Sequence, residues 1–207
     1  MHDFEYRQGK LHCGEVPLEA IAREVGTPFY CYSLPTLHRH IQAFEEPLSG
    51  VDHQTCFAMK ANSSLAILTY MARHGLGADV VSGGELYRAL KSGVPGEKIV
   101  YSGVGKTTGE IEMAIAAGIM MFNIESEQEL EVINECAGTL EKKAPISIRV
   151  NPDVDPMTHP YISTGMRENK FGIDVEASLA QYLYCLLYTS DAADDLLCVH
   201  HGGRRTI

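Results

Sequence analysis

One lysine of this 207-residue chain stands where an amine could do chemistry. Lys60 follows the apolar run T-C-F-A-M (residues 55–59), which predicts a short buried strand, and residues 61–64 (A-N-S-S) supply a turn and helix caps. A lysine that closes a buried strand loses water, which favours the free amine that Schiff-base chemistry with a carbonyl requires. The structural alternative is a lysine that extends its charge to the surface at a strand end.

Two other charged residues interrupt apolar runs. Asp79 lies in G-A-D-V-V, and a buried carboxylate needs a partner, so an ion pair with Lys60 at the end of the neighbouring strand is expected. Arg149 follows P-I-S-I and points to the opposite side of the pleat from the isoleucines. An arginine in that position needs an acceptor, and an inward-facing carboxylate is one option.

A repeated format surrounds these residues from position 55 onward. Apolar runs begin near residues 55, 77, 98, 120 and 145, and the first four are each followed by an amphipathic helical pattern. Three of those helices open with S/T-x-x-E, the capping box, at residues 82–85, 107–110 and 126–129. Glycine is expected to end the four helices, at Gly75, Gly93, Gly118 and Gly138. The format predicts parallel βα units.

Parallel βα units allow a doubly wound sheet or a closed barrel. The even spacing favours an incomplete (β/α)8 TIM-type barrel of about five βα units. A short β/α preface precedes it, with an edge strand over residues 4–13, a helix over 17–25, a strand over 28–32 and a helix over 35–44. Chemistry in such barrels lies at the carboxyl ends of the strands, where Lys60, Asp79, Ser102 and Arg149 are all expected.

Two glycine-rich segments look like phosphate sites. S-G-V-G-K-T (residues 102–107) ends like a Walker A loop, but Val100 stands where that motif requires its first glycine, so nucleoside triphosphate binding is excluded. S-G-G (residues 82–84) precedes a helix and could expose backbone amides to an anion. The capping box already accounts for Ser82, and we prefer the structural interpretation.

Several strings resemble the fold-type III pyridoxal-phosphate decarboxylases. F-A-M-K-A-N-S (57–63) and G-A-D-V-V-S-G-G-E-L-Y-R-A-L (77–90) carry the likeness, and T-H-P-Y-I-S-T-G (158–165) with K-F-G (170–172) is most similar to the diaminopimelate decarboxylase branch. The resemblance implies that Lys60 holds pyridoxal 5'-phosphate, that Asp79 orients this lysine, and that Arg149 supports the cofactor near its ring hydroxyl. It also implies decarboxylation of meso-2,6-diaminopimelate to L-lysine in a full-length parent.

Two alternatives stay open beside that activity. The chain could be a catalytically inactive fragment, or its parent could act on ornithine, arginine or carboxynorspermidine. The resemblance covers about residues 15–182, and the expected domains are a preface over 1–33, a partial cofactor-binding barrel over 34–182 and a probable non-native tail over 183–207. By resemblance, the first strand belongs to a carboxy-terminal β-domain, and five of eight barrel strands are present. The same resemblance implies a homodimer for the parent.

Composition narrows the partners. Seventeen Lys and Arg against 27 Asp and Glu give a net charge of −10 without a basic cluster, which argues against nucleic acid and anionic membranes. No apolar run approaches the roughly 20 residues of a spanning helix. Six cysteines form no C-x-x-C pair, so neither a disulfide framework nor a metal site is predicted. A cytoplasmic enzyme acting on a small amino acid is expected.

Overall fold

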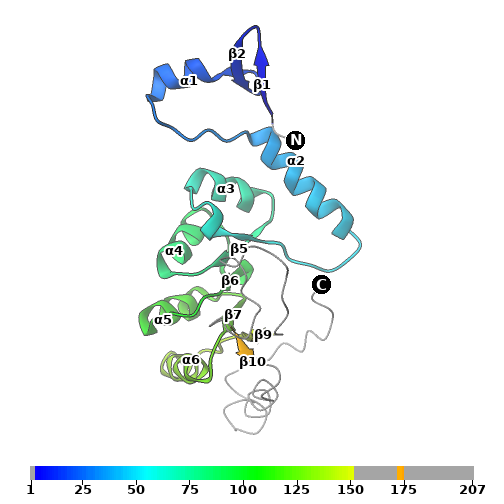
Figure 1. Cartoon of the computed structure of the whole chain (residues 1–207). Helices are drawn as coiled ribbons and strands as arrows, with labels where there is room; N and C mark the ends of the chain where they lie inside the picture. Colours follow the sequence, from blue (N-terminus) through cyan, green and yellow to red (C-terminus); the bar gives the residue numbers. More distant parts are fainter. Residues whose placement is uncertain (1–2, 152–171, 175–207) are drawn as a thin grey trace. The chain divides into compact units, whose positions relative to one another are not determined.

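The computed structural model describes residues 3–151 and 172–174. The chain divides into two compact units, Met1–His53 and Gln54–Ile207 (Figure 1). The expected boundary after residue 33 concerns the domains of the parent and stays a prediction. The expected features of residues 152–171 and 175–207, including the T-H-P-Y-I-S-T-G string and the tail, lie outside the described residues.

The first unit combines a small antiparallel sheet with two helices. Strands β1 (Phe4–Arg7), β2 (Lys10–Cys13) and β3 (Val16–Pro17) pair in that order and lead into α1 (Leu18–Val25). Helix α2 (Leu34–Glu45) and the 3-10 turn η1 (Glu46–Leu48) follow. Ser33 caps α2 by accepting a hydrogen bond from the Thr36 amide at 3.2 Å. The two predicted helices are therefore confirmed to within one residue at each end.

Two strand predictions in this unit are wrong. Residues 4–13 form a hairpin instead of one strand, because Gln8 and Gly9 both take positive φ angles, 51° and 78°, and turn the chain between β1 and β2. Residues 28–32 form no strand. An apolar run becomes a strand only where another strand offers hydrogen bonds, and none pairs with it in the described part of the chain.

The second unit is built on a parallel sheet whose strand order follows the sequence. Strands β4 (Cys56–Ala58), β5 (Gly77–Val80), β6 (Ile99–Tyr101), β7 (Met121–Ile124) and β8 (Ile146–Ile148) lie side by side in that order. Each begins within one residue of its predicted start. A separate two-stranded parallel ladder, which was not predicted, joins β9 (Val150–Asn151) to β10 (Ile173–Asp174).

Helices α3 (Leu65–Arg73), α4 (Gly83–Lys91), α5 (Thr108–Ala117) and α6 (Glu127–Thr139) alternate with these strands. They stand in a row on one side of the sheet (Figure 1). Two further 3-10 turns, η2 (Met59–Ala61) and η3 (Gly96–Lys98), follow β4 and precede β6. The architecture is an incomplete (β/α)8 barrel, as predicted.

The capping boxes form, with one difference from their expected geometry. Ser82 and Ser126 accept from the amides of Glu85 and Glu129, both at 3.2 Å, as the boxes require. In a standard capping box the carboxylate accepts from the amide of the capping serine. Here Glu85 and Glu129 accept instead from the amides of the preceding residues, Val81 and Glu125, both at 2.8 Å. Each loop before these helices is thereby fixed to the helix it enters.

Three of the four predicted helix-ending glycines are confirmed. Gly75, Gly93 and Gly118 follow or cap α3, α4 and α5 with φ angles of 83°, 93° and 64°. The prediction that Gly138 ends a helix is wrong, because α6 continues through it to Thr139. The left-handed residue after α6 is Glu141, with φ of 51°.

The core of this unit lies between the sheet and its helices. Alternate strand residues are fully buried on the helix-facing side, for example Val80, Tyr101 and Phe122, and they pack against Leu86, Ile133 and their neighbours. The other side chains of each strand face away from the helices. No helix in the described residues is long and apolar enough to cross a membrane.

Candidate active site

The side of the sheet that faces away from the helices carries a polar cavity at the carboxyl ends of the strands. Strand register aligns Asn123 with Ser147, and the pleat puts Asp79, Ser102 and Arg149 on the same side as these two. The cavity measures about 540 Å³. Its lining consists of Lys60, Asp79, Val81, Ser102, Gly103, Asn123, Ser147 and Arg149. All four residues that the sequence placed at strand ends therefore meet in one site.

Asp79 of β5 is held by a hydrogen-bonded line of side chains that runs through Ser102, directly after β6, to Asn123 of β7. The Ser102 hydroxyl donates to Asp79 Oδ1 at 2.6 Å, and Asn123 Nδ2 donates to Ser102 Oγ at 3.0 Å. A carboxylate that accepts a short hydroxyl bond keeps a fixed orientation, since O–H to carboxylate bonds of this length are among the stronger ones. Asp79 thus presents a fixed carboxylate to the cavity.

Lys60 lines the same cavity but differs from expectation in two respects. It lies in η2, directly after β4, and its side chain is exposed, so the predicted loss of water is wrong for the described chain. The predicted ion pair is wrong as well, because Lys60 and Asp79 form none in the described residues and Asp79 is bonded to Ser102 instead. Both residues line an open cavity, where access to water weakens the drive to pair two opposite charges.

Arg149 is paired with a carboxylate, which is the alternative that the sequence left open. Its Nη1 donates to Glu125 Oε1 at 2.9 Å, and the Glu125 side chain is only 4% exposed. The second oxygen of Glu125 accepts from the Gly172 amide at 2.9 Å. Arg149 also accepts through its carbonyl from the Ile173 amide at 2.8 Å. One buried carboxylate therefore joins the site arginine to the start of β10.

The S-G-V-G-K-T loop contributes to the cavity through its first two residues. Its lysine, Lys106, points into the protein and pairs with Glu129 at 2.5 Å. The ammonium of Lys106 is thereby already neutralised by a carboxylate. Burial and this pairing make Lys106 a structural group of the loop.

A backbone amide of the S-G-G segment is also already hydrogen-bonded within the protein. The Gly83 amide donates to Glu110 Oε1 at 2.6 Å, and Glu110 Oε2 accepts from the Thr107 amide at 2.9 Å. Glu110 therefore caps α4 and α5 together. A side chain at Gly83 would bring its Cβ within 2.8 Å of Glu110 Cγ, so the position needs glycine for this contact. The structural interpretation of S-G-G holds.

Three site residues escaped the sequence analysis. Asn123 and Ser147 are polar residues inside the apolar strands M-F-N-I and I-S-I, the same signal that singled out Asp79. Glu125 directly follows β7, where a carboxylate at the strand end resembles an ordinary helix-capping residue. Its burial and its pairing with Arg149 depend on strand register, which a single sequence does not give.

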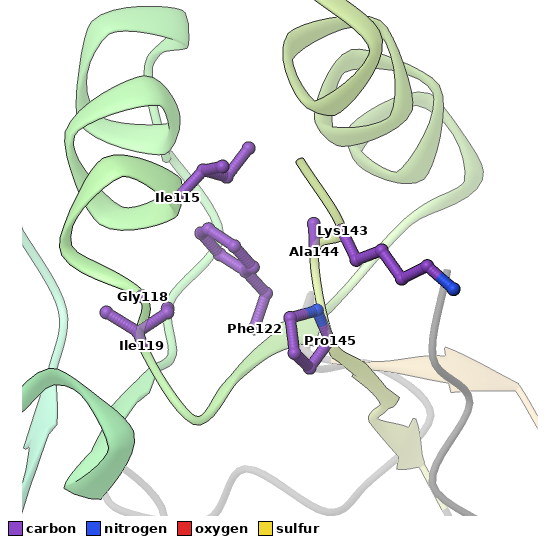
Figure 2. A pocket seen from close by; sticks show the side chains of 7 residues that line it. All are labelled: Ile115, Gly118, Ile119, Phe122, Lys143, Ala144 and Pro145. Carbon is purple, nitrogen blue, oxygen red and sulfur yellow. The ribbon is translucent and has the colours of Figure 1, made fainter. Parts of the chain in front are cut away.

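A second cavity, of about 230 Å³, lies at the opposite end of the strands (Figure 2). Ile115 of α5, Ile119 of the following loop and Phe122 of β7 line it, and Pro145 borders it directly before β8. The amine of Lys143 extends away from the apolar side chains. The lining holds one amine, that of Lys143, and no carboxylate or hydroxyl beside it, so the polar cavity is the better candidate site for chemistry.

The chain is similar to a known protein family over most of its length. Residues 34–189 match the family model described as the pyridoxal binding domain of pyridoxal-dependent decarboxylases. Diaminopimelate decarboxylase of Vibrio cholerae is 50% identical over 183 residues, which is 88% of this chain and 44% of that protein. That of Aquifex aeolicus is 49% identical over 180 residues, 87% and 42% of the two chains. The chain thus spans less than half the length of these relatives.

Solved structures give the same result. Diaminopimelate decarboxylase of M. jannaschii, solved in co-complex with L-lysine, has a TM-score of 0.82 and 39% identity, covering 96% of this chain and 47% of that one. The Helicobacter pylori enzyme complexed with L-lysine has a TM-score of 0.79 and 42% identity over 87% and 44%. By sequence and by fold, this chain belongs to the pyridoxal-dependent decarboxylase family and carries its pyridoxal-binding domain.

Proposed function

We propose that this chain is the cofactor-binding half of a diaminopimelate decarboxylase, whose full-length form converts meso-2,6-diaminopimelate to L-lysine. The observation that carries the proposal is the meeting of Lys60, Asp79, Ser102 and Arg149 in one cavity at the strand ends. Relatives about half identical to the chain bear this enzyme name, which supports the choice of substrate.

The cavity suits pyridoxal phosphate in volume and chemistry. Small-molecule sites measure roughly 300–1,000 Å³, and the polar cavity measures about 540 Å³. Its residues offer a primary amine, an oriented carboxylate, a hydroxyl and a guanidinium. Two groups in residues 3–151 and 172–174 were candidates for binding the phosphate, the Gly83 amide and the Lys106 amine. Both are already hydrogen-bonded to glutamates. The proposal therefore assigns phosphate binding to other residues of the full-length protein.

Each residue has a distinct task in this proposal. Lys60 supplies the amine that the aldehyde of the cofactor requires. Asp79 attracts and orients that amine, and Ser102 with Asn123 keeps the carboxylate in place. Arg149 donates to anionic oxygens of the bound cofactor or substrate while Glu125 limits its movement. When bound, pyridoxal phosphate accepts the electron pair that remains after carbon dioxide leaves the amino acid.

The organisation of the full-length protein is also part of the proposal. Residues 34–182 would form the barrel part, and residues 1–33 would supply a strand to a carboxy-terminal β-domain. We further propose a cytoplasmic homodimer: the family resemblance implies the dimer, and the composition of the chain favours the cytoplasm.

Borohydride trapping tests the cofactor site on the 207-residue chain itself. The chain is incubated with pyridoxal phosphate, reduced and digested, and the peptides are weighed by mass spectrometry. We expect a stable pyridoxyl group on Lys60, and slower labelling in Asp79→Asn, which keeps the shape but removes the charge. Equal labelling of exposed lysines such as Lys91 would contradict a specific site.

The substrate is tested on the full-length protein. Release of carbon dioxide from meso-2,6-diaminopimelate, with none from ornithine, arginine or carboxynorspermidine, is the expected result. If the protein instead released carbon dioxide from one of the other three amino acids, the proposed substrate would be wrong but the proposed cofactor site would stand.

A second candidate is that the 207-residue chain alone is inactive. The exposure of Lys60 favours it, because an amine in open water gains little from its surroundings. Absence of a pyridoxyl group on Lys60, together with activity of the full-length protein, would establish this reading.

A further inference from the structure

Lys106 is a buried charged residue that does not line the polar cavity and has no role in the proposed reaction. Its side chain is only 1% exposed, although lysine side chains are rarely buried to that degree. The ammonium lies 5.6 Å from the centre of the Tyr101 ring, within the range of a cation–π contact. Such a burial needs a specific reason.

The ammonium donates to three oxygens, which matches the three N–H groups of lysine. They are the Gly103 carbonyl at 2.7 Å, the Asn123 carbonyl at 2.9 Å and Glu129 Oε1 at 2.5 Å. All of its hydrogen-bonding capacity is used inside the protein. Lys106 is therefore unavailable to a ligand in this arrangement.

The two carbonyls belong to Asn123 and to the neighbour of Ser102, the two residues whose side chains hold Asp79. Gly103 directly follows Ser102, whose hydroxyl donates to Asp79, and Asn123 is the residue whose side chain donates to Ser102. One ammonium thus fixes the main chain at both ends of the Ser102 to Asn123 hydrogen bond. Gly103 has a φ of 99°, a left-handed backbone conformation that favours glycine at this position.

Stability alone does not explain this arrangement. Replacing a buried ion pair by uncharged groups of similar size is often neutral or stabilising, because the charges lose water when they are buried. Glu129 has a second task, since its other oxygen accepts from the Glu125 amide at 2.8 Å. The buried pair therefore connects the Ser102 loop to the residue that holds Arg149.

We propose that Lys106 is a positioning residue, whose ammonium sets the Ser102 and Asn123 main chain so that Asp79 faces Lys60 in a reactive geometry. The inference deepens the proposed function and rests on it. Lys106 acts through the loop and does not contact cofactor or substrate.

The test compares three variants of the 207-residue chain. Lys106→Met removes the ammonium but leaves the buried Glu129 carboxylate without its counter-charge, so misfolding could mask the effect on the loop. The double variant Lys106→Met/Glu129→Gln removes both charges and keeps an acceptor for the Glu125 amide. Lys98→Met is the matched control, because Lys98 also donates to a carbonyl, that of Gly75 at 2.8 Å, but at the amino end of β6.

Two measurements separate positioning from a merely structural role. Hydrogen exchange of residues 102–106 reports whether the loop is held, and borohydride trapping with pyridoxal phosphate reports the reactivity of Lys60. In the double variant we expect faster loop exchange and labelling slower by about ten-fold or more, with a melting temperature close to wild type. Lys98→Met should change neither measurement.

Unchanged exchange in the double variant would overturn the inference, and so would faster exchange with labelling at the wild-type rate. If the wild-type chain itself gives no adduct on Lys60, the proposed cofactor site fails in this chain. The exchange measurement then still decides whether Lys106 holds the loop, so the two failures are distinguishable.

Discussion

Glu125 shows how a single buried carboxylate organises one side of the site. With 4% of its side chain exposed, it accepts from Arg149 and from the Gly172 amide at 2.9 Å each. Both oxygens are therefore used, which is the condition under which a buried carboxylate is tolerated. Arg149 stays at the cavity because this acceptor is fixed.

Glu125→Ala should destabilise the protein. The change leaves the Gly172 amide without its acceptor and removes a carboxylate from Arg149, so we expect a loss of about 1–3 kcal/mol in the free energy of unfolding. Urea denaturation followed by circular dichroism measures it. The exposed Glu131 on α6 provides the control, and Glu131→Ala should stay within about 0.5 kcal/mol of wild type. Equal effects of the two substitutions would refute the role of Glu125.

Residue types predicted which side chains line the cavity better than they predicted which of these side chains bond to each other. Lys60, Asp79 and Arg149 were identified because each is a charged residue at or within an apolar run, and all three line the cavity. The ion pair of Lys60 with Asp79 was wrong, since side-chain partners depend on register and on access to water. Ser102, one strand further along, is the partner that the backbone supplies to Asp79.

At the scale of elements, the helix starts are connected to one another through glutamates. Glu110 accepts from the Gly83 amide of α4 at 2.6 Å and from the Thr107 amide of its own helix at 2.9 Å. These backbone hydrogen bonds, first from Thr107 and then from Gly83, lower the pKa of the Glu110 carboxyl below its ordinary value. The charged form is therefore the one that the native state binds.

This linkage gives a pH-dependent stability. Because the native pKa of Glu110 lies below its unfolded value, its contribution is present above the ordinary value of 4.5 and is lost as the pH falls through the native value. Glu110→Gln should therefore lower the urea midpoint clearly at pH 7 and progressively less toward pH 3. Glu112→Gln, two residues along α5, is the control. A gap between wild type and Glu110→Gln that stays constant over this range would contradict the linkage.

Elements with strong local signals were predicted to within about one residue. Strands β4 to β8 and the starts of their helices follow from apolar runs and capping boxes, which act within a few residues of chain. The β1–β2 hairpin was missed because its turn depends on positive φ angles at Gln8 and Gly9. Strands β9 and β10 were missed because two residues each, far apart in sequence, leave no periodic pattern.

At the scale of the second unit, the two ends of the parallel sheet differ in the polarity of the side chains that they carry. Polar side chains meet at the carboxyl ends, whereas the apolar cavity of Figure 2 lies at the amino ends. In barrels of this type the carboxyl end carries the chemistry and the amino end mainly stability. The two ends should therefore respond differently to small substitutions.

A pair of conservative variants checks this division. Ile119→Val at the apolar cavity should cost about 0.5–1.5 kcal/mol of unfolding free energy, and it should leave borohydride labelling of Lys60 unchanged. Ser102→Ala should stay within about 1 kcal/mol of wild type, because water in the open cavity can replace the hydroxyl, yet slow the labelling. Denaturation midpoints and labelling rates of both variants are compared. Slower labelling in Ile119→Val with normal labelling in Ser102→Ala would reverse the assignment.

The strand order β4-β5-β6-β7-β8 has a consequence for biosynthesis. Each strand pairs with the one made just before it, so a nascent polypeptide leaving the ribosome can extend the sheet one unit at a time. Pairing between near neighbours in sequence also keeps the entropy lost in closing each loop small. Translation itself can thus dictate the order of assembly, without waiting for distant parts of the polypeptide.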